Sequence, residues 1–83
     1  MPTDKEVANL LEEIIQDRGV PRNIKNSISE SLNILNGTAS NEEKIASVIS
    51  ILDEASNDPN LSMYTRTHIW SIVSVLESLQ QKV

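Results

Sequence analysis

Apolar residues recur every three or four positions along most of this chain, which is the spacing of an α-helix and not the alternation of a β-strand. The pattern divides into four stripes separated by short polar segments. The stripes contain Val7, Leu10, Leu11, Ile14 and Ile15; Ile24, Ile28, Leu32 and Leu35; Ile45, Val48, Ile49, Leu52 and Ala55; and Ile69, Ile72, Val73, Leu76 and Leu79. Because each apolar stripe must be buried against another element, we predict four helices that pack together.

The polar segments of the first half indicate where two of the helices begin and end. The first helix is predicted to start at a capping box, Thr3-Asp4-Lys5-Glu6, and to close at Gly19 in a left-handed conformation. Pro21 is predicted at the first position of the second helix, because its missing amide hydrogen has no intrahelical partner there. The second helix is expected to stop at Asn36-Gly37.

The second half of the chain has similar start and stop signals. A second capping box, Ser40-Asn41-Glu42-Glu43, predicts the start of the third helix, and Asn57-Asp58-Pro59-Asn60 predicts its end. The fourth helix is predicted to begin near Ser62 and to run almost to the C-terminus. Because all three connections are short, neighbouring helices must run antiparallel. We therefore predict an all-α fold, a four-helix up-down-up-down antiparallel bundle, with residues 1–83 forming one domain.

Composition and charge limit the function classes. The chain has no cysteine, which excludes disulfides, thiolate metal sites and thiol catalysis and fits a cytoplasmic protein. No window approaches the roughly 20 apolar residues of a membrane span, so we expect no membrane association. The net charge of −5 opposes general nucleic-acid binding, which needs Lys and Arg to displace counterions.

The chemistry-bearing residues do not form a recognisable catalytic pattern. His68 is the only histidine, without the spacings of a di-iron bundle or a zinc protease, so we predict no metal and no cofactor. Glu13 and Asp17 share a helix face, which is far more often solvated surface than acid–base machinery. The serines are expected on polar faces, with no residue spaced to activate them. We therefore predict that the protein is not an enzyme.

The fourth helix carries more apolar surface than one stripe needs. At 100° per residue, Tyr64, His68 and Val75 flank its stripe on one side, and Trp70 lies on the other side. Either this helix sits deepest in the bundle or its outer flank meets a second chain. We favour a packing role for Trp70, in the core or in a homo-oligomer, over a hot spot for another partner. The candidate interface residues are Tyr64, Trp70 and Val75.

The predicted topology also gathers charges at one end of the bundle. Basic residues meet the acidic Asp53 and Glu54 there, and we favour cross-helix pairing because both carboxylates oppose their own helix dipole. The alternative is a site for an anion or a partner at the helix N-termini. Its candidate contacts are Arg22, Lys25, Arg66 and His68.

Two segments also resemble a known family. They are Val20-Pro21-Arg22-Asn23-Ile24, and Asp58-Pro59-Asn60 followed by Thr65-Arg66-Thr67 and Ile69-Trp70. With the chain length, they resemble an uncharacterised family of short acidic archaeal proteins of unknown function, over the whole chain. The resemblance implies a helical bundle in an archaeal cytoplasm, and it brings no activity, substrate or catalytic residue.

The sequence alone does not identify the function, and three hypotheses remain. The leading one is a non-catalytic interaction module that self-associates or binds another protein through the flank of the fourth helix. The alternative is an accessory protein of a nucleic-acid or ribonucleoprotein complex that uses the basic residues at one bundle end. An enzyme is the third, and it would need a concave pocket lined by perturbed groups.

Overall fold

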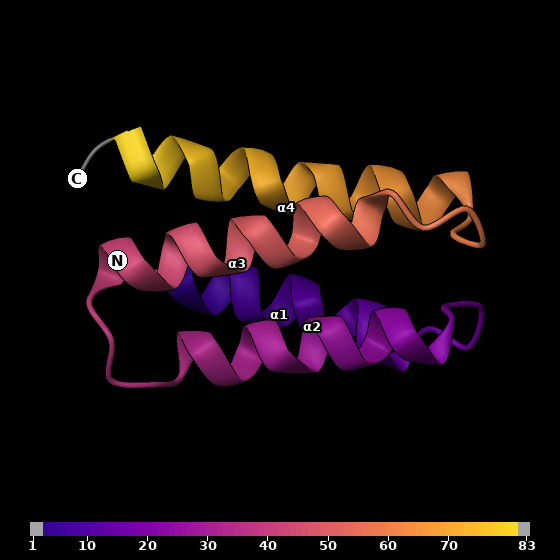
Figure 1. The fold of residues 1–83 in the computed structure, drawn as a ribbon, viewed down its shortest axis with the longest axis horizontal. Helices are drawn as coiled ribbons and strands as arrows, with labels where there is room; N and C mark the ends of the chain where they lie inside the picture. Colours follow the sequence, from indigo (N-terminus) through magenta and orange to yellow (C-terminus); the bar gives the residue numbers. More distant parts are fainter. Residues whose placement is uncertain (1–2, 82–83) are drawn as a thin grey trace.

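The chain folds into four helices joined by short turns in the computed structural model, which describes residues 3–81 and the side chains of residues 5–80 (Figure 1). The helices are α1 (Thr3–Gln16), α2 (Arg22–Leu35), α3 (Asn41–Ser56) and α4 (Met63–Gln81). Successive helices run in opposite directions, and the pairs in contact are α1–α2, α2–α3, α3–α4 and α1–α4. The predicted up-down-up-down four-helix bundle is confirmed.

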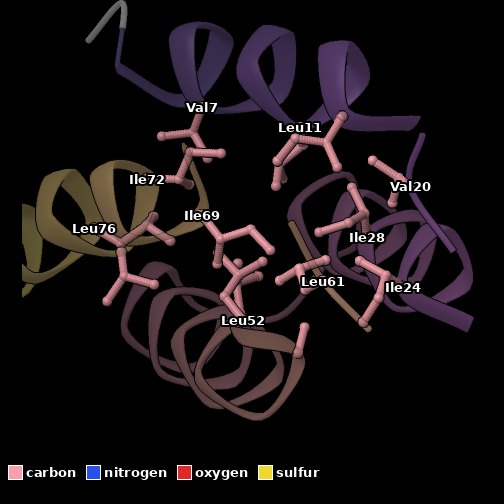
Figure 2. Packing of buried hydrophobic residues seen from close by; sticks show 14 of the residues in the cluster. Val7, Leu11, Val20, Ile24, Ile28, Leu52, Leu61, Ile69, Ile72 and Leu76 are labelled. Carbon is pink, nitrogen blue, oxygen red and sulfur yellow. The ribbon is translucent and has the colours of Figure 1, made fainter. Parts of the chain in front are cut away.

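The four apolar stripes meet in one core (Figure 2). Leu11, Ile28, Leu52 and Ile69, one from each helix, are completely buried. Removal of these side chains from water is the main force that holds the helices together. The remaining stripe residues are buried or lie at the edge of the core, where Leu10, Ile15, Leu32, Leu35, Ile49 and Leu79 are partly exposed.

Two core residues come from the turns and not from the stripes. Val20 lies in the α1–α2 turn and Leu61 in the α3–α4 turn, and each is only 5% exposed. Both turns lie at the same end of the bundle, so the two side chains close the core at that end (Figures 1 and 2). The periodic pattern misses them because a single apolar residue within a polar turn has no period.

The prediction that the serines lie on polar faces is wrong for two of them. Ser31 is completely buried on α2, and its hydroxyl donates to the Ser27 carbonyl at 3.1 Å. Ser56 is also buried, and its hydroxyl donates to the Asp53 carbonyl at 2.8 Å. Because each hydroxyl donates to a carbonyl of its own helix, its hydrogen bond is kept when the side chain is buried, and no donor is left unsatisfied.

Hydroxyl side chains mark the starts of α3 and α4. Ser40 precedes α3 and accepts the Glu43 amide at 3.3 Å, which is one of the two bonds of the predicted capping box. Ser62 precedes α4, accepts the Thr65 amide at 3.2 Å, and donates to the Thr65 hydroxyl at 3.0 Å. The capping box predicted at Thr3 involves side chains outside the described residues.

The end of α1 differs from the prediction. Gly19 does not adopt a left-handed conformation, since no residue between 3 and 81 has a positive φ. Instead α1 ends at Gln16, and the Asp17 carboxylate accepts the Gly19 amide at 2.8 Å. This local turn, in which an Asp side chain replaces a backbone acceptor, removes the need for glycine's conformational freedom. Pro21 also sits one residue earlier than predicted, as the residue before α2, with φ −57° and ψ 149°.

Candidate interaction surface on helix α4

The outer face of α4 carries the exposed large apolar side chains of the described chain. Met63 is 65% exposed, Tyr64 71% and Trp70 50%, and no other large apolar residue described is exposed. The opposite side of the same helix is buried, with Ile69, Ile72 and Leu76 in the core. The broad apolar arc predicted for α4 is therefore not explained by deep burial of the helix, because its flanks reach solvent.

The three candidate interface residues do not form one patch. Tyr64 and Val75 share the flank towards α1, where Val75 packs partly buried against the core. Trp70 lies about 120° around the helix from Tyr64 at 100° per residue, on the other flank. Met63 is two turns before Trp70 and shares its flank, so the two exposed residues lie on one side. The sequence pattern did not single out Met63, although its spacing of seven residues from Trp70 would have identified it.

Tyr64 and His68 pack against each other on α4, and His68 also approaches α1. Their rings meet edge-on, with centroids 6.1 Å apart and planes at 74°. His68 Nε2 lies 3.7 Å from an Oε atom of Glu13, so a protonated His68 forms an ion pair with α1. This geometry favours a packing role for His68, which the sequence had grouped with the basic residues of a candidate anion site. A shallow hollow of about 400 Å³ lies beside them on the outer face.

Arg66 is held by the turn between α3 and α4. Its Nε donates to the Ser56 carbonyl at 3.0 Å, and its Nη2 donates to the Asp58 carbonyl at 2.9 Å. These carbonyls lie where α3 ends, and a charged donor makes strong bonds to them. Much of the Arg66 hydrogen-bonding capacity is therefore used inside the protein, which weakens the case for an anion site there.

The same turn is tied to the start of α2 through Asp58. Asn23 donates its side-chain amide to one Asp58 oxygen at 2.8 Å, and the Asn60 backbone amide donates to the other at 2.8 Å. These two bonds, with a smaller contribution from the Arg66 charge, lower the pKa of Asp58 below its ordinary value of 3.8. The result is a polar network across three helix ends.

The basic residues named by the sequence are dispersed around this end. Arg66 is bound to the α3–α4 turn and His68 faces Glu13 on α1, whereas Arg22 is exposed and Lys25 partly exposed on α2. Within residues 5–80, the one close approach of a basic side chain to a carboxylate is that of His68 to Glu13, so the expected cross-helix pairing of Asp53 and Glu54 does not form. Hydrogen bonds from neutral donors to the Asp58 carboxylate, and from Arg66 to backbone carbonyls, hold this end instead.

A second hollow, about 530 Å³ in volume, lies between α2 and α3. Glu30, Glu54 and Asp58 line it, over a floor that includes Ile24 and Ile51. Across the described residues, no three His, Cys, Asp or Glu side chains are placed to hold a metal ion. The hollow is open and acidic, and the one hydroxyl that lines it, from Ser27, donates to the Asn23 carbonyl at 3.2 Å and has no histidine beside it in the lining.

Between residues 3 and 81, no helix combines the length and the apolar character needed to cross a bilayer.

Comparison with known proteins relates this chain to a family without an assigned role. The model of an uncharacterised protein family, UPF0147, matches residues 3–79. A UPF0147 protein of Methanothermobacter thermautotrophicus is 46% identical over 80 residues, which are 95% of this chain and 78% of that protein. A UPF0147 protein of Methanocaldococcus jannaschii is 48% identical over 79 residues, 92% of this chain and 83% of that protein.

Two solved structures have the same fold. The crystal structure of a UPF0147 protein from Thermoplasma acidophilum matches with a TM-score of 0.88 and 37% identity, over 95% of this chain and 99% of that one. The crystal structure of MMP1188, described as a protein of unknown function, matches with a TM-score of 0.87 and 40% identity, over 92% and 88% of the two chains. The names of these relatives indicate no catalytic role.

Proposed function

The chain belongs to the uncharacterised protein family UPF0147, an archaeal family of unknown function, and from this premise we propose that it is a non-catalytic protein-interaction module that binds through the outer face of α4. The observation that carries the proposal is the exposure of Met63, Tyr64 and Trp70 on one helix. Trp and Tyr are the residues most enriched in binding hot spots. The proposal includes the cytoplasmic location predicted from the sequence.

The distribution of charge supports the choice of α4. Glu77 is the one charged residue among the exposed positions described on α4, which otherwise carry apolar, hydroxyl and amide side chains. The exposed faces of α1 and α3 instead carry several carboxylates, such as Glu12 and Glu13 on α1 and Glu42 and Glu43 on α3. Charged residues are depleted from the centres of protein interfaces because their desolvation is costly. Covering the outer face of α4 therefore costs less desolvation free energy than covering the exposed faces of α1 or α3.

Site-specific photo-crosslinking tests this proposal. A photoreactive amino acid at Ser74, one turn after Trp70 and exposed, is compared with one at Asn26, exposed on α2. Both in an extract of an archaeon that contains a family member and in a concentrated solution of the bait protein alone, crosslinked protein is sought from each position, and we expect it from Ser74 and little from Asn26. Adding Trp70→Ala to the Ser74 bait should remove most of the product. Equal crosslinking from both positions, or no effect of Trp70→Ala, would contradict the proposal.

A further inference from the structure

We propose that the partner covering the Trp70 side of α4 is a second copy of this chain, packed antiparallel about a two-fold axis that crosses the Trp70 flank at the level of residues 71 and 72 along the helix. This inference rests on the proposed function and specifies its partner. It comes from the order of side chains along the flank that carries Trp70. Arg66, Trp70, Ser74 and Glu77 follow one another there at helical spacing.

The charges on this flank are self-complementary. Arg66 lies near the start of α4 and Glu77 near its end, about 16 Å apart at 1.5 Å per residue. In an antiparallel pair of α4 helices, Arg66 of each copy therefore faces Glu77 of the other. A parallel pair would instead bring like charges together. Because the interface is symmetric, each favourable contact occurs twice.

Neither charge is neutralised by an ion pair among the described residues, whose one ion pair is His68 with Glu13. Arg66 is also held in place, since its Nε and Nη2 bind the Ser56 and Asp58 carbonyls. A guanidinium has further N–H groups beyond these two, so Arg66 can also donate to a carboxylate of the second copy without leaving the turn. Its side chain has already lost conformational freedom, which reduces the entropy cost of pairing.

The bulky and small residues have the same symmetry as the charges. The midpoint between Arg66 and Glu77 falls between Ser71 and Ile72, and the midpoint between Trp70 and Ser74 falls at Ile72. One two-fold axis therefore sets Trp70 of each copy over Ser74 of the other, while the charges pair at both ends. Both Trp70 and Ser74 are exposed, so the small serine leaves room for the indole.

The size of the surface predicts weak association. Helix α4 has 19 residues and is about 28 Å long, so a contact centred on one helix falls below the roughly 1,200 Å² of a standard interface. Each pairing of the partly exposed Arg66 with the exposed Glu77 adds little on its own. We therefore expect a dimer that forms at high protein concentration, and measurements should extend to about 1 mM, where contacts of this size are populated.

Sedimentation equilibrium over a concentration series tests the dimer with a matched pair of charge variants. Glu77→Lys places like charges opposite Arg66 twice, and we expect dimerisation about tenfold weaker. Glu12→Lys makes the same change of net charge at an exposed position on α1, and we expect wild-type dimerisation or slightly stronger, since the chain becomes less negative. Trp70→Ala should weaken the dimer, whereas Tyr64→Ala on the other flank should not.

A mixing experiment tests the antiparallel pairing itself. Arg66→Glu and Glu77→Lys should each associate poorly alone but pair with one another, because the mixed dimer restores both opposite-charge contacts. Circular dichroism checks that Arg66→Glu is folded. If this variant does not fold, the Glu77→Lys and Trp70→Ala comparisons still decide the proposal.

Two outcomes would overturn the dimer. One is a wild-type protein that remains monomeric at 1 mM, and the other is equal weakening by Glu77→Lys and Glu12→Lys. If the protein is monomeric but still crosslinks to a different protein through Ser74, the partner is not a second copy of this chain, and the proposed interaction module is unaffected.

Discussion

Arg66 and Trp70 lie one turn apart on the same flank of α4, yet the fold uses them in opposite ways. Arg66 binds two backbone carbonyls where α3 ends, and Trp70 remains half exposed and is not among the residues packed against the core. The comparison separates Arg66, which helps to hold the bundle together, from Trp70, which does not pack in its core. Arg66 has a structural explanation within the fold, whereas the described core does not account for Trp70, the chain's only tryptophan, which our proposal assigns to a contact outside the monomer.

The largest expected effect compares Trp70 with its neighbour in the sequence. Ile69 is completely buried, so Ile69→Ala removes core contacts and leaves a cavity, and we expect it to lower the free energy of unfolding by about 3 kcal/mol. Trp70→Ala should cost about 1 kcal/mol in dilute monomer, as is usual for a partly exposed residue. Urea unfolding at low protein concentration measures both. Equal losses would mean that Trp70 belongs to the core.

The next effect tests the role of Arg66 in the turn. Arg66→Ala removes two charge-assisted hydrogen bonds and leaves the Ser56 and Asp58 carbonyls without that donor. We expect a loss of about 2 kcal/mol in the free energy of unfolding. Arg22→Ala is the control, because Arg22 is exposed at the start of α2, and it should change stability by less than about 0.5 kcal/mol. If the two variants were alike, the turn would not depend on Arg66.

Protonation of Asp58 tests the other half of the same network and should have a smaller effect. Its folded-state pKa lies below the ordinary 3.8, so the unfolded chain binds this proton more readily. The contribution of Asp58 to stability is therefore complete above pH 3.8 and disappears as the pH falls below that value. Asp58→Asn should destabilise the protein at neutral pH, because an amide nitrogen cannot accept from Asn23.

Urea unfolding is measured from neutral pH down to acid pH. The difference in the free energy of unfolding between wild type and Asp58→Asn should shrink as the pH falls. Asp53→Asn is the control, since Asp53 is exposed in the last turn of α3, and it should be neutral or slightly stabilising. A gap that persists unchanged at low pH would show that the charged carboxylate is not the group that matters.

The smallest effect is expected at the other turn of the same end. Because Gly19 has no positive φ, Gly19→Ala introduces no backbone strain, and its Cβ would meet the Asp17 carboxylate at 3.3 Å. The tight contact offsets the entropy gained in the unfolded chain, so we expect a change within about 0.5 kcal/mol. If thermal unfolding showed that Gly19→Ala lowers the free energy of unfolding by well above about 1 kcal/mol, Gly19 would need the left-handed conformation that the sequence predicted.

These turns also show where the sequence was informative and where it was not. The four helices and most of the core follow from the periodic spacing of residues such as Leu11, Leu52 and Ile69, because that spacing is a local property of the chain. The contribution of Leu61 to the core could not be predicted, since it depends on how the α3–α4 turn folds back over the core. Gly19 was misjudged because the Asp17 side chain offered a local alternative.

The candidate surface was predicted in part. Helical projection placed Trp70 on the flank of the fourth helix, but it could not decide between core and solvent, because burial depends on how the neighbouring helices are oriented. Arg66 was assigned to a possible anion site on its charge and its predicted place near the start of the fourth helix. Its actual partners are backbone carbonyls, which are present at every residue and leave no trace in the sequence.

Fluorescence of the single tryptophan tests the central claim most directly. If the fold leaves Trp70 exposed and association covers it, dilute protein should emit at long wavelength and be readily quenched by acrylamide. Raising the concentration should shift the emission to shorter wavelength and reduce quenching, and Glu77→Lys should suppress both changes. Blue-shifted, protected emission already in dilute monomer would place Trp70 inside its own core and contradict the account.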